Sequence, residues 1–194
     1  MKQPLLYRIV RPIITILFNI FFHPHIIGKE NIPTKEKIIL AGNHTNILDS
    51  LLLISCTKRT VHFLAKVELT KSPLGIIFKN MGIIPVDRKA KQNQEAYNEA
   101  IKVLEANEII GIFPESTINR EKKEPTLPFK KGTVRMSYQT KSKIIPFCIS
   151  GKYNVFGKGI TITFEKPYNV QTNDFIKETD KLREKINTMI IERR

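Results

Sequence analysis

One short segment, AGNHTNILDS at residues 41–50, holds a histidine and an aspartate at a spacing that suits proton transfer. An aspartate that fixes one tautomer of an imidazole leaves the other ring nitrogen free to act as a general base. A structural interpretation also fits, in which Asn46 caps a helix whose third residue is Asp49 and His44 is an incidental loop residue. The segment alone supports both interpretations equally. They are compatible, because the start of a helix favours an ionised aspartate.

The elements that must position this pair are predicted to alternate between strands and helices. Apolar runs predict strands at 37–43, 60–66, 82–88, 108–115, 143–151 and 159–167. Helical periodicity predicts helices at 47–56, 72–81 and 91–107, after Gly132, and over the last twenty residues. In the last helix, the side chains expected to face inward are Phe175, Ile176, Leu182, Ile186, Met189 and Ile190.

This alternation predicts a single-domain α/β fold with a mostly parallel or mixed sheet flanked by helices. Sites in such folds gather where a strand ends and leads into a helix. His44 occupies such a position, since the strand before it is predicted to end near Gly42.

The N-terminal segment at residues 5–22 is mostly apolar but carries a polar stripe at helical spacing, formed by Arg8, Arg11, Thr15 and Asn19. At about 1.5 Å per residue the segment barely reaches the ~30 Å of a hydrocarbon core. It therefore predicts an amphipathic helix lying in the membrane interface, with its arginines reaching the headgroups. The alternative is a helix that packs on the protein's own core. We expect residues 1–25 to form this helix and residues 26–194 the main domain; the following HPHIIGKE is unlike a signal-peptide cleavage site.

The chain is strongly basic, with 32 Lys and Arg against 18 Asp and Glu and a net charge of +14. This charge favours an anionic partner such as a phospholipid surface, a phosphorylated substrate or nucleic acid. Nucleic acid is not expected, because the sequence lacks helix-turn-helix, zinc-finger and Gly-rich phosphate-loop signatures. Cys56 and Cys148 match no metal spacing and are expected to be buried free thiols. His23 and His25 flank a proline without further ligands, so no metal site is expected there. No cofactor is expected either.

Four blocks follow one another in the chain. The His44 and Asp49 pair comes first, followed by GIIPVDR (82–88), GIFPEST (111–117) with FKKGTVRMS (129–137), and IIPFCISG (144–151). In this order and spacing they resemble the glycerolipid acyltransferase family, which includes the 1-acylglycerol-3-phosphate acyltransferases. The resemblance covers about residues 38–151, and it identifies residues 26–194 as an acyltransferase domain.

The resemblance implies transfer of a fatty acyl group from an acyl thioester, carried by acyl carrier protein or coenzyme A, to the hydroxyl of 1-acylglycerol-3-phosphate. His44 would be the general base, Asp49 would orient it, and the alcohol would attack the thioester directly. Substrate would be bound by the residues of the later blocks, Arg88, Glu115, Ser116, Thr117, Lys130 and Lys131. The implied partners are the donor thioester, a lysophospholipid and an anionic membrane surface. We expect a peripheral or monotopic protein on the cytoplasmic face of the cell membrane.

One block departs from the family pattern, which commonly reads Pro-Glu-Gly-Thr-Arg-Ser. Here Ser116 and Thr117 are followed by Ile118, where that pattern has arginine. Nearby cations at Arg120, Lys130 and Lys131 can supply the charge, or the acceptor differs. The alternatives are therefore a family member that acts on another lysolipid or lipid alcohol, and a membrane-surface protein without activity.

Overall fold

The computed structural model describes residues 4–71, 75, 80–87, 93–121, 123–157 and 159–193. In this part of the chain seven strands form one sheet in the order β1-β7-β6-β2-β5-β3-β4. The strands are β1 (His25–Ile27), β2 (Ile38–Gly42), β3 (Val61–Lys66), β4 (Ile83–Val86), β5 (Ile109–Ile112), β6 (Lys143–Gly151) and β7 (Ile160–Phe164). Neighbouring strands are parallel except β6 and β7, which are antiparallel. The predicted α/β fold with a mostly parallel, mixed sheet is confirmed.

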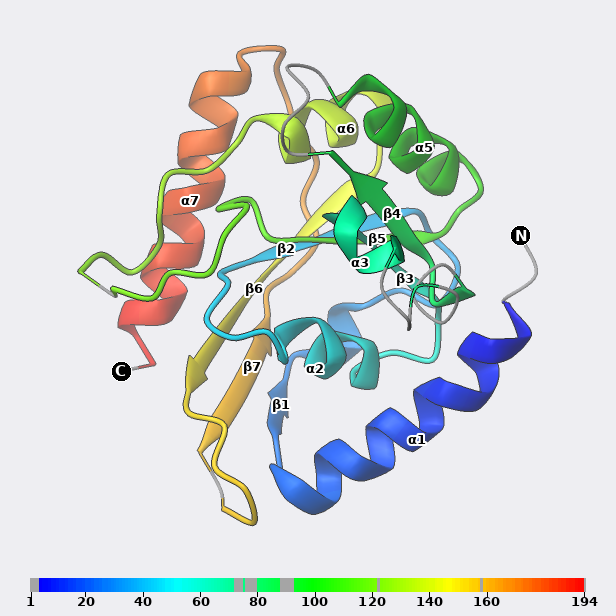
Figure 1. Cartoon of the computed structure of the whole chain (residues 1–194). Helices are drawn as coiled ribbons and strands as arrows, with labels where there is room; N and C mark the ends of the chain where they lie inside the picture. Colours follow the sequence, from blue (N-terminus) through cyan, green and yellow to red (C-terminus); the bar gives the residue numbers. More distant parts are fainter. Residues whose placement is uncertain are drawn as a thin grey trace.

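Helices cover both faces of this sheet (Figure 1). They are α1 (Leu5–Phe21), α2 (Asp49–Ser55), α3 (Val67–Lys71), α5 (Gln94–Glu105), α6 (Gly132–Thr140) and α7 (Phe175–Ile191), with a short 3-10 turn at Lys29–Asn31. In β2 every residue is buried, and successive side chains point to opposite faces. Ile38 and Leu40 join the core under α1 and α2, while Ile39 and Ala41 join the core under α5, α6 and α7. The continuous apolar run of β2 therefore reflects burial on both faces.

Some predicted elements need correction. Helix α2 begins at Asp49, so Asp49 is its first residue and not its third, and its N-cap Leu48 has no side-chain cap. Neither the edge strand β1 nor the short helix α3 was expected. The helix predicted at 72–81 falls mostly outside the described residues. In α7, Ile176 is 59% exposed and so does not face inward, because it lies on the solvent side of this amphipathic helix.

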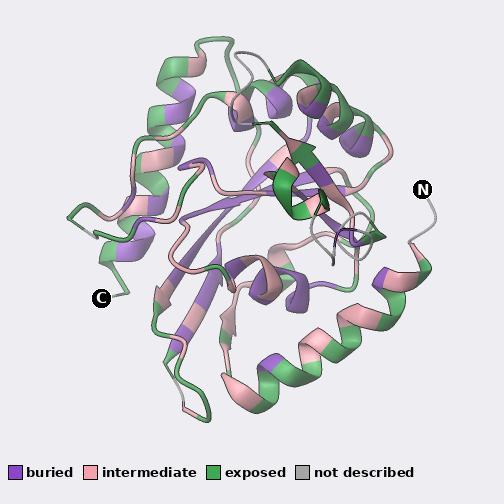
Figure 2. Ribbon diagram, viewed as in Figure 1, coloured by how far each residue is buried: buried purple, intermediate pink, exposed green. Residues whose placement is uncertain are grey.

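Helix α1 has two apolar faces. Its inner face packs against α2 and the core, where the buried Tyr7 hydroxyl donates to the Arg59 carbonyl oxygen and accepts from the Val61 N–H, both at 3.1 Å. Its outer face exposes a row of large side chains, Leu5, Ile9, Ile13, Ile16, Leu17 and Ile20. Exposed segments recur along the whole of α1 in Figure 2. The helix therefore caps the protein's own core and also presents an unpaired apolar surface.

The polar stripe of α1 does not face outward along its whole length. The Arg11 guanidinium donates to the Thr57 carbonyl oxygen at the end of α2, so this arginine is half-buried and is not directed to lipid headgroups as predicted. Arg8 remains exposed. Within the described ranges, we find no helix whose length and hydropathy would let it cross a bilayer. The predicted boundary at residue 25 falls in β1, and the division into two domains stays a prediction.

Candidate active site

Three loops converge at one edge of the sheet. Strands β5 and β6 both run parallel to β2 and flank it, so the carboxyl ends of all three lie side by side (Figure 1). His44 follows β2, Glu115 follows β5 and Tyr153 follows β6. This edge is where ligand sites form in open parallel sheets.

The two residues predicted to transfer and support a proton are in contact. His44 Nδ1 lies 2.9 Å from Asp49 Oδ2, and the aspartate side chain is completely buried while the histidine is 18% exposed. With Nδ1 hydrogen-bonded to the carboxylate, Nε2 is the ring nitrogen that can take a proton from substrate. The geometry has the form required of a base and its orienting carboxylate, and the catalytic role stays a prediction.

The Asp49 carboxylate accepts several hydrogen bonds besides the one from His44. Oδ2 accepts the Thr45 N–H at 2.6 Å and the Asn46 N–H at 2.8 Å. Oδ1 accepts the Thr45 hydroxyl at 3.2 Å and the Tyr153 hydroxyl at 2.7 Å. A buried carboxylate needs such a set of donors to remain ionised. Asp49 is therefore held in one orientation before substrate arrives.

The structural interpretation of this loop is partly correct. Asn46 Oδ1 accepts the Leu48 N–H at 3.0 Å, and Asp49 in turn accepts the Asn46 N–H, as the acidic residue of a capping box does. Because α2 begins only at Asp49, Asn46 caps the turn before the helix and not the helix itself. One carboxylate thus closes the turn and orients the His44 ring.

The backbone of His44 is held on both sides. Its N–H donates to Glu115 Oε1 at 2.7 Å, and its carbonyl oxygen accepts the Asn119 N–H at 2.9 Å. Glu115 Oε2 accepts the Leu127 N–H at 2.7 Å, so this 5% exposed carboxylate joins the β2–α2 loop to the segment before α6. Burial raises the pKa of Glu115, and these two backbone hydrogen bonds oppose the rise. Glu115 therefore braces the site through the backbone.

The His44 ring is also fixed by packing. It stacks on the Phe113 ring with centroids 4.1 Å apart and planes 12° from parallel. Next to it, the buried amide of Asn43 accepts the Ile149 N–H at 2.7 Å and donates to the Ile149 carbonyl oxygen at 2.9 Å. The end of β2 is thereby tied to β6, and the ring plane is set by β5.

His44 opens onto a small hollow of about 120 Å³. Its walls are formed by residues from the loops after β2 and β5, the end of β6 and the end of α7: Asn43, His44, Thr45, Glu115, Asn119, Glu124, Pro125, Ile149, Ser150, Gly151 and Ile190. A hydroxyl group entering it would meet the imidazole. That the predicted chemistry occurs in this hollow stays a prediction.

The other predicted substrate-binding residues lie outside its walls. Ser116 is half-buried with a positive φ of 60°, Thr117 is exposed, and Lys130 and Lys131 are exposed just before α6. Arg88 lies outside the described residues. The structure therefore brings together His44, Asp49 and Glu115, and the substrate-binding roles stay predictions.

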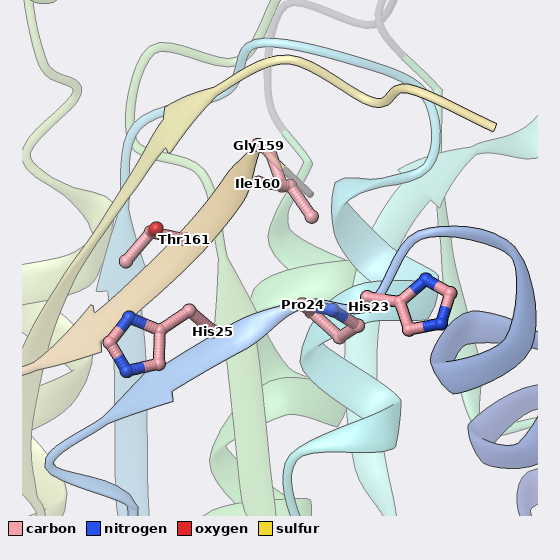
Figure 3. A pocket seen from close by; sticks show the side chains of 6 residues that line it. All are labelled: His23, Pro24, His25, Gly159, Ile160 and Thr161. Atoms are coloured by element: carbon pink, nitrogen blue, oxygen red, sulfur yellow. The ribbon is translucent and has the colours of Figure 1, made fainter. Parts of the chain in front are cut away.

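A second hollow, of about 420 Å³, lies where β1 meets β7. Figure 3 shows the rings of His23 and His25 on opposite sides of Pro24, and they do not point toward one another. Among the described residues, no group of three or more His, Cys, Asp or Glu side chains could hold a metal ion. The described residues that line this hollow include no acid–base pair of the kind formed by His44 and Asp49.

Sequence reasoning missed Tyr153, Phe113 and Asn43. Tyr153 comes two residues after β6, at the same sheet edge as His44, so the rule that sites lie at carboxyl ends of parallel strands could have singled it out. Phe113 and Asn43 immediately follow β5 and β2. Without knowledge of the strand order, nothing connected these positions to His44.

Comparisons with known proteins give a consistent result. A family model described as Acyltransferase matches residues 23–150. A 1-acyl-sn-glycerol-3-phosphate acyltransferase of Borreliella burgdorferi is 38% identical over 135 residues, which are 69% of this chain and 53% of that protein. A Bacillus subtilis protein of the same name is 29% identical over 126 residues, or 64% of this chain and 61% of that protein. The chain thus spans little more than half the length of these curated relatives.

A solved structure shares the fold. It is that of the 1-acyl-sn-glycerophosphate (LPA) acyltransferase, PlsC, from Thermotoga maritima, with a TM-score of 0.75 over 96% of this chain and 77% of that one. The two sequences are 22% identical, so this likeness speaks for the fold alone.

Proposed function

Because the chain belongs to the acyltransferase family, we propose that it transfers a fatty acyl group from an acyl thioester to the hydroxyl of 1-acylglycerol-3-phosphate, forming phosphatidic acid. The observation that carries this proposal is the 2.9 Å contact between a fully buried Asp49 and His44, which lines the hollow. A base fixed in this way suits deprotonation of an alcohol.

In the proposed reaction, His44 Nε2 accepts the proton of the acceptor hydroxyl while its oxygen attacks the thioester carbonyl carbon. The new C–O bond forms, the C–S bond breaks, and the proton held on His44 passes to the departing thiolate. Asp49 stabilises the imidazolium that exists between these steps. The protein itself forms no covalent intermediate, so neither Cys56 nor Cys148 takes part; both are buried free thiols, as predicted, and burial raises the pKa of each.

The proposed donor is the thioester of acyl carrier protein or of coenzyme A. Both carriers are acidic, and a chain with a net charge of +14 attracts either. The phosphate of the acceptor is proposed to contact Arg88, with Lys130 and Lys131 supplying further positive charge, since guanidinium groups bind phosphate through paired hydrogen bonds.

The proposed location is the cytoplasmic face of the cell membrane. Support comes from the outer face of α1, whose exposed row runs from Leu5 to Ile20 and is at least 45% exposed at each member. A contiguous apolar stripe of this kind is typical of helices that lie in a membrane interface.

The test is acyl transfer by the purified chain with lysophosphatidate vesicles and each of the two donors. Because His44 is proposed to move a proton, His44→Ala should lower kcat by at least about a hundredfold while the thermal unfolding temperature stays near that of the parent. A folded His44→Ala variant with near-parental turnover would remove the base from the mechanism. Transfer to an uncharged lipid alcohol but not to lysophosphatidate would favour the alternative acceptor raised by Ile118.

A further inference from the structure

The Tyr153 hydroxyl reaches Asp49 from the β6–β7 loop. It donates to Oδ1 at 2.7 Å, on the oxygen opposite the one that receives His44 Nδ1. Burial, and next the negative charge of Asp49, raise the pKa of Tyr153, so the hydroxyl keeps its proton and acts as a donor. The contact joins residues 104 positions apart in the chain.

The Tyr153 ring is held by α1. Phe18 and Phe22 meet it edge-on, with centroids 6.4 Å and 5.6 Å away and planes close to perpendicular. The same loop is fastened further along, where the Phe156 N–H donates to the Phe21 carbonyl oxygen at 2.6 Å and the two rings lie 5.2 Å apart. The C-terminal turn of α1 thus fixes the loop that carries Tyr153.

From this geometry we propose that Tyr153 is a positioning residue for the acyl transfer, which fixes the Asp49 carboxylate and tempers its attraction for the His44 imidazolium. The proposal rests on the proposed function of the His44 and Asp49 pair. A donor on Oδ1 draws negative charge away from Oδ2 and so makes the carboxylate a weaker partner for a protonated ring. Tyr153 thereby keeps His44 able to accept and also to release the proton.

Tyr153→Phe removes the hydroxyl and leaves the ring contacts with Phe18 and Phe22 in place. We expect two effects. The midpoint of the His44 ring titration, followed by NMR in the purified protein, should move to higher pH by about 0.5 to 1 unit, because Asp49 attracts the protonated ring more strongly. The acid limb of the kcat/KM profile should move in the same direction, and kcat should fall roughly tenfold, since the carboxylate is less well held.

The matched control is Tyr7→Phe. Tyr7 is also a buried tyrosine whose hydroxyl makes hydrogen bonds, but these go to the backbone of Arg59 and Val61. It should lower the unfolding temperature and leave the His44 midpoint and the pH profile unchanged. The other titratable groups near the pair, Glu115, Glu124 and Cys56, are the same in both variants and in the parent, so they cancel from the comparison.

The titration and the kinetics separate the failure of this proposal from failure of the proposed function. With only four histidines in the chain, His44→Gln assigns the relevant NMR signal without any activity. An unchanged midpoint and unchanged acid limb in Tyr153→Phe would overturn the positioning role, even if stability and kcat both fell. A shifted midpoint in a protein that transfers no acyl group would support the contact and instead overturn the acyltransferase proposal.

Discussion

Replacing Asp49 by asparagine separates the charge of this side chain from its shape. If the amide oxygen of the asparagine takes the place of Oδ2, it can still accept from His44 Nδ1, Thr45 N–H and Asn46 N–H. The amide NH₂ then faces the hydroxyls of Thr45 and Tyr153, and a hydroxyl can rotate to accept. Asp49→Asn should therefore keep the same hydrogen-bond partners and the His44 tautomer while removing one negative charge.

The magnitudes predict a large effect on turnover and a small one on stability. Hydrogen bonds to a charged group contribute about 1.5 to 3 kcal/mol against about 0.5 to 1.5 kcal/mol for neutral ones, so their weakening destabilises the variant. Burying a charge costs several kcal/mol, and the neutral asparagine avoids this cost, which stabilises the variant. We expect the free energy of unfolding to change by no more than about 2 kcal/mol. The imidazolium, however, loses a counter-charge that contributes about 4 kcal/mol at about 4 Å with an effective dielectric constant near 20.

If the proton is between half and fully transferred in the transition state, kcat should fall by about thirtyfold to a thousandfold. The assay is steady-state acyl transfer at saturating donor and acceptor, with thermal unfolding measured on the same samples. Asp174→Asn is the matched control, because Asp174 also accepts a backbone N–H at the start of a helix, α7, but has no histidine partner. It should leave kcat unchanged.

Two results would refute the reasoning about Asp49. One is a folded Asp49→Asn variant with near-parental kcat. The other concerns the double variant that combines Asp49→Asn with His44→Ala. If its kcat were lower than that of His44→Ala alone by the same factor that Asp49→Asn produces in the parent, the two residues would act independently. Residues that act as one unit lose little further activity when both are removed.

Three other changes test the remaining parts of the proposal. Arg88→Ala should raise the KM for lysophosphatidate about tenfold to a hundredfold, since a charge-assisted contact to phosphate contributes roughly 1.5 to 3 kcal/mol. Arg88→Lys should recover only part of the lost binding. Equal losses toward an unphosphorylated acceptor would contradict the phosphate contact. Replacing Ile13, Ile16 and Ile20 of α1 by glutamine should lower vesicle binding roughly a hundredfold, because each half-exposed side chain contributes about 1 kcal/mol. The control Ile176→Gln on α7 should leave vesicle binding unchanged. Co-sedimentation measures this binding, and unchanged binding of the triple variant would place the membrane contact elsewhere. Glu115→Gln should destabilise the protein, because its amide NH₂ faces a backbone N–H, and more so near pH 4.5 than near neutral pH. Because the pKa of Glu115 is raised, the parent loses stability as pH rises through that window, whereas glutamine does not titrate. Urea unfolding at both pH values measures the difference in stability between variant and parent. A difference that grew with pH would contradict this reasoning.

The choice of substitutions in α1, in place of a deletion of residues 1–22, follows from the structure. Tyr7 and Phe18 are part of the core, so removing the helix would uncover it and confuse unfolding with loss of membrane binding. The sequence predicted the helix and its exposed apolar surface from periodicity. It could not show that Arg11 turns inward, because the partner carbonyl of Thr57 comes from a helix end 46 residues away.

The sheet could be predicted from local patterns, whereas parts of the site could not. Long apolar runs such as those of β2 and β6 reveal buried strands, and the family resemblance, which the matches to the Acyltransferase model and to curated relatives confirm, pointed to His44 and Asp49. Strand order depends on tertiary packing, and together with the contacts from the end of α1 it places Tyr153 beside Asp49. The short strand β1 escaped prediction because three residues give no periodicity.

The loop after β2 also shows why its structural and catalytic interpretations could not be separated from the sequence. The contacts that close the turn before α2, from Thr45 and Asn46 to Asp49, are the ones that aim the carboxylate at His44. A side chain whose hydrogen bonds are already made at a helix start needs little reorganisation when charge develops on the neighbouring ring. Local folding therefore already supplies the hydrogen bonds that offset the burial of Asp49, and in the proposed mechanism the charge on His44 would develop beside a carboxylate already in place. Positioning from the far side, by Tyr153 and the end of α1, then links the helix that presents the exposed apolar row to the pair proposed to move the proton.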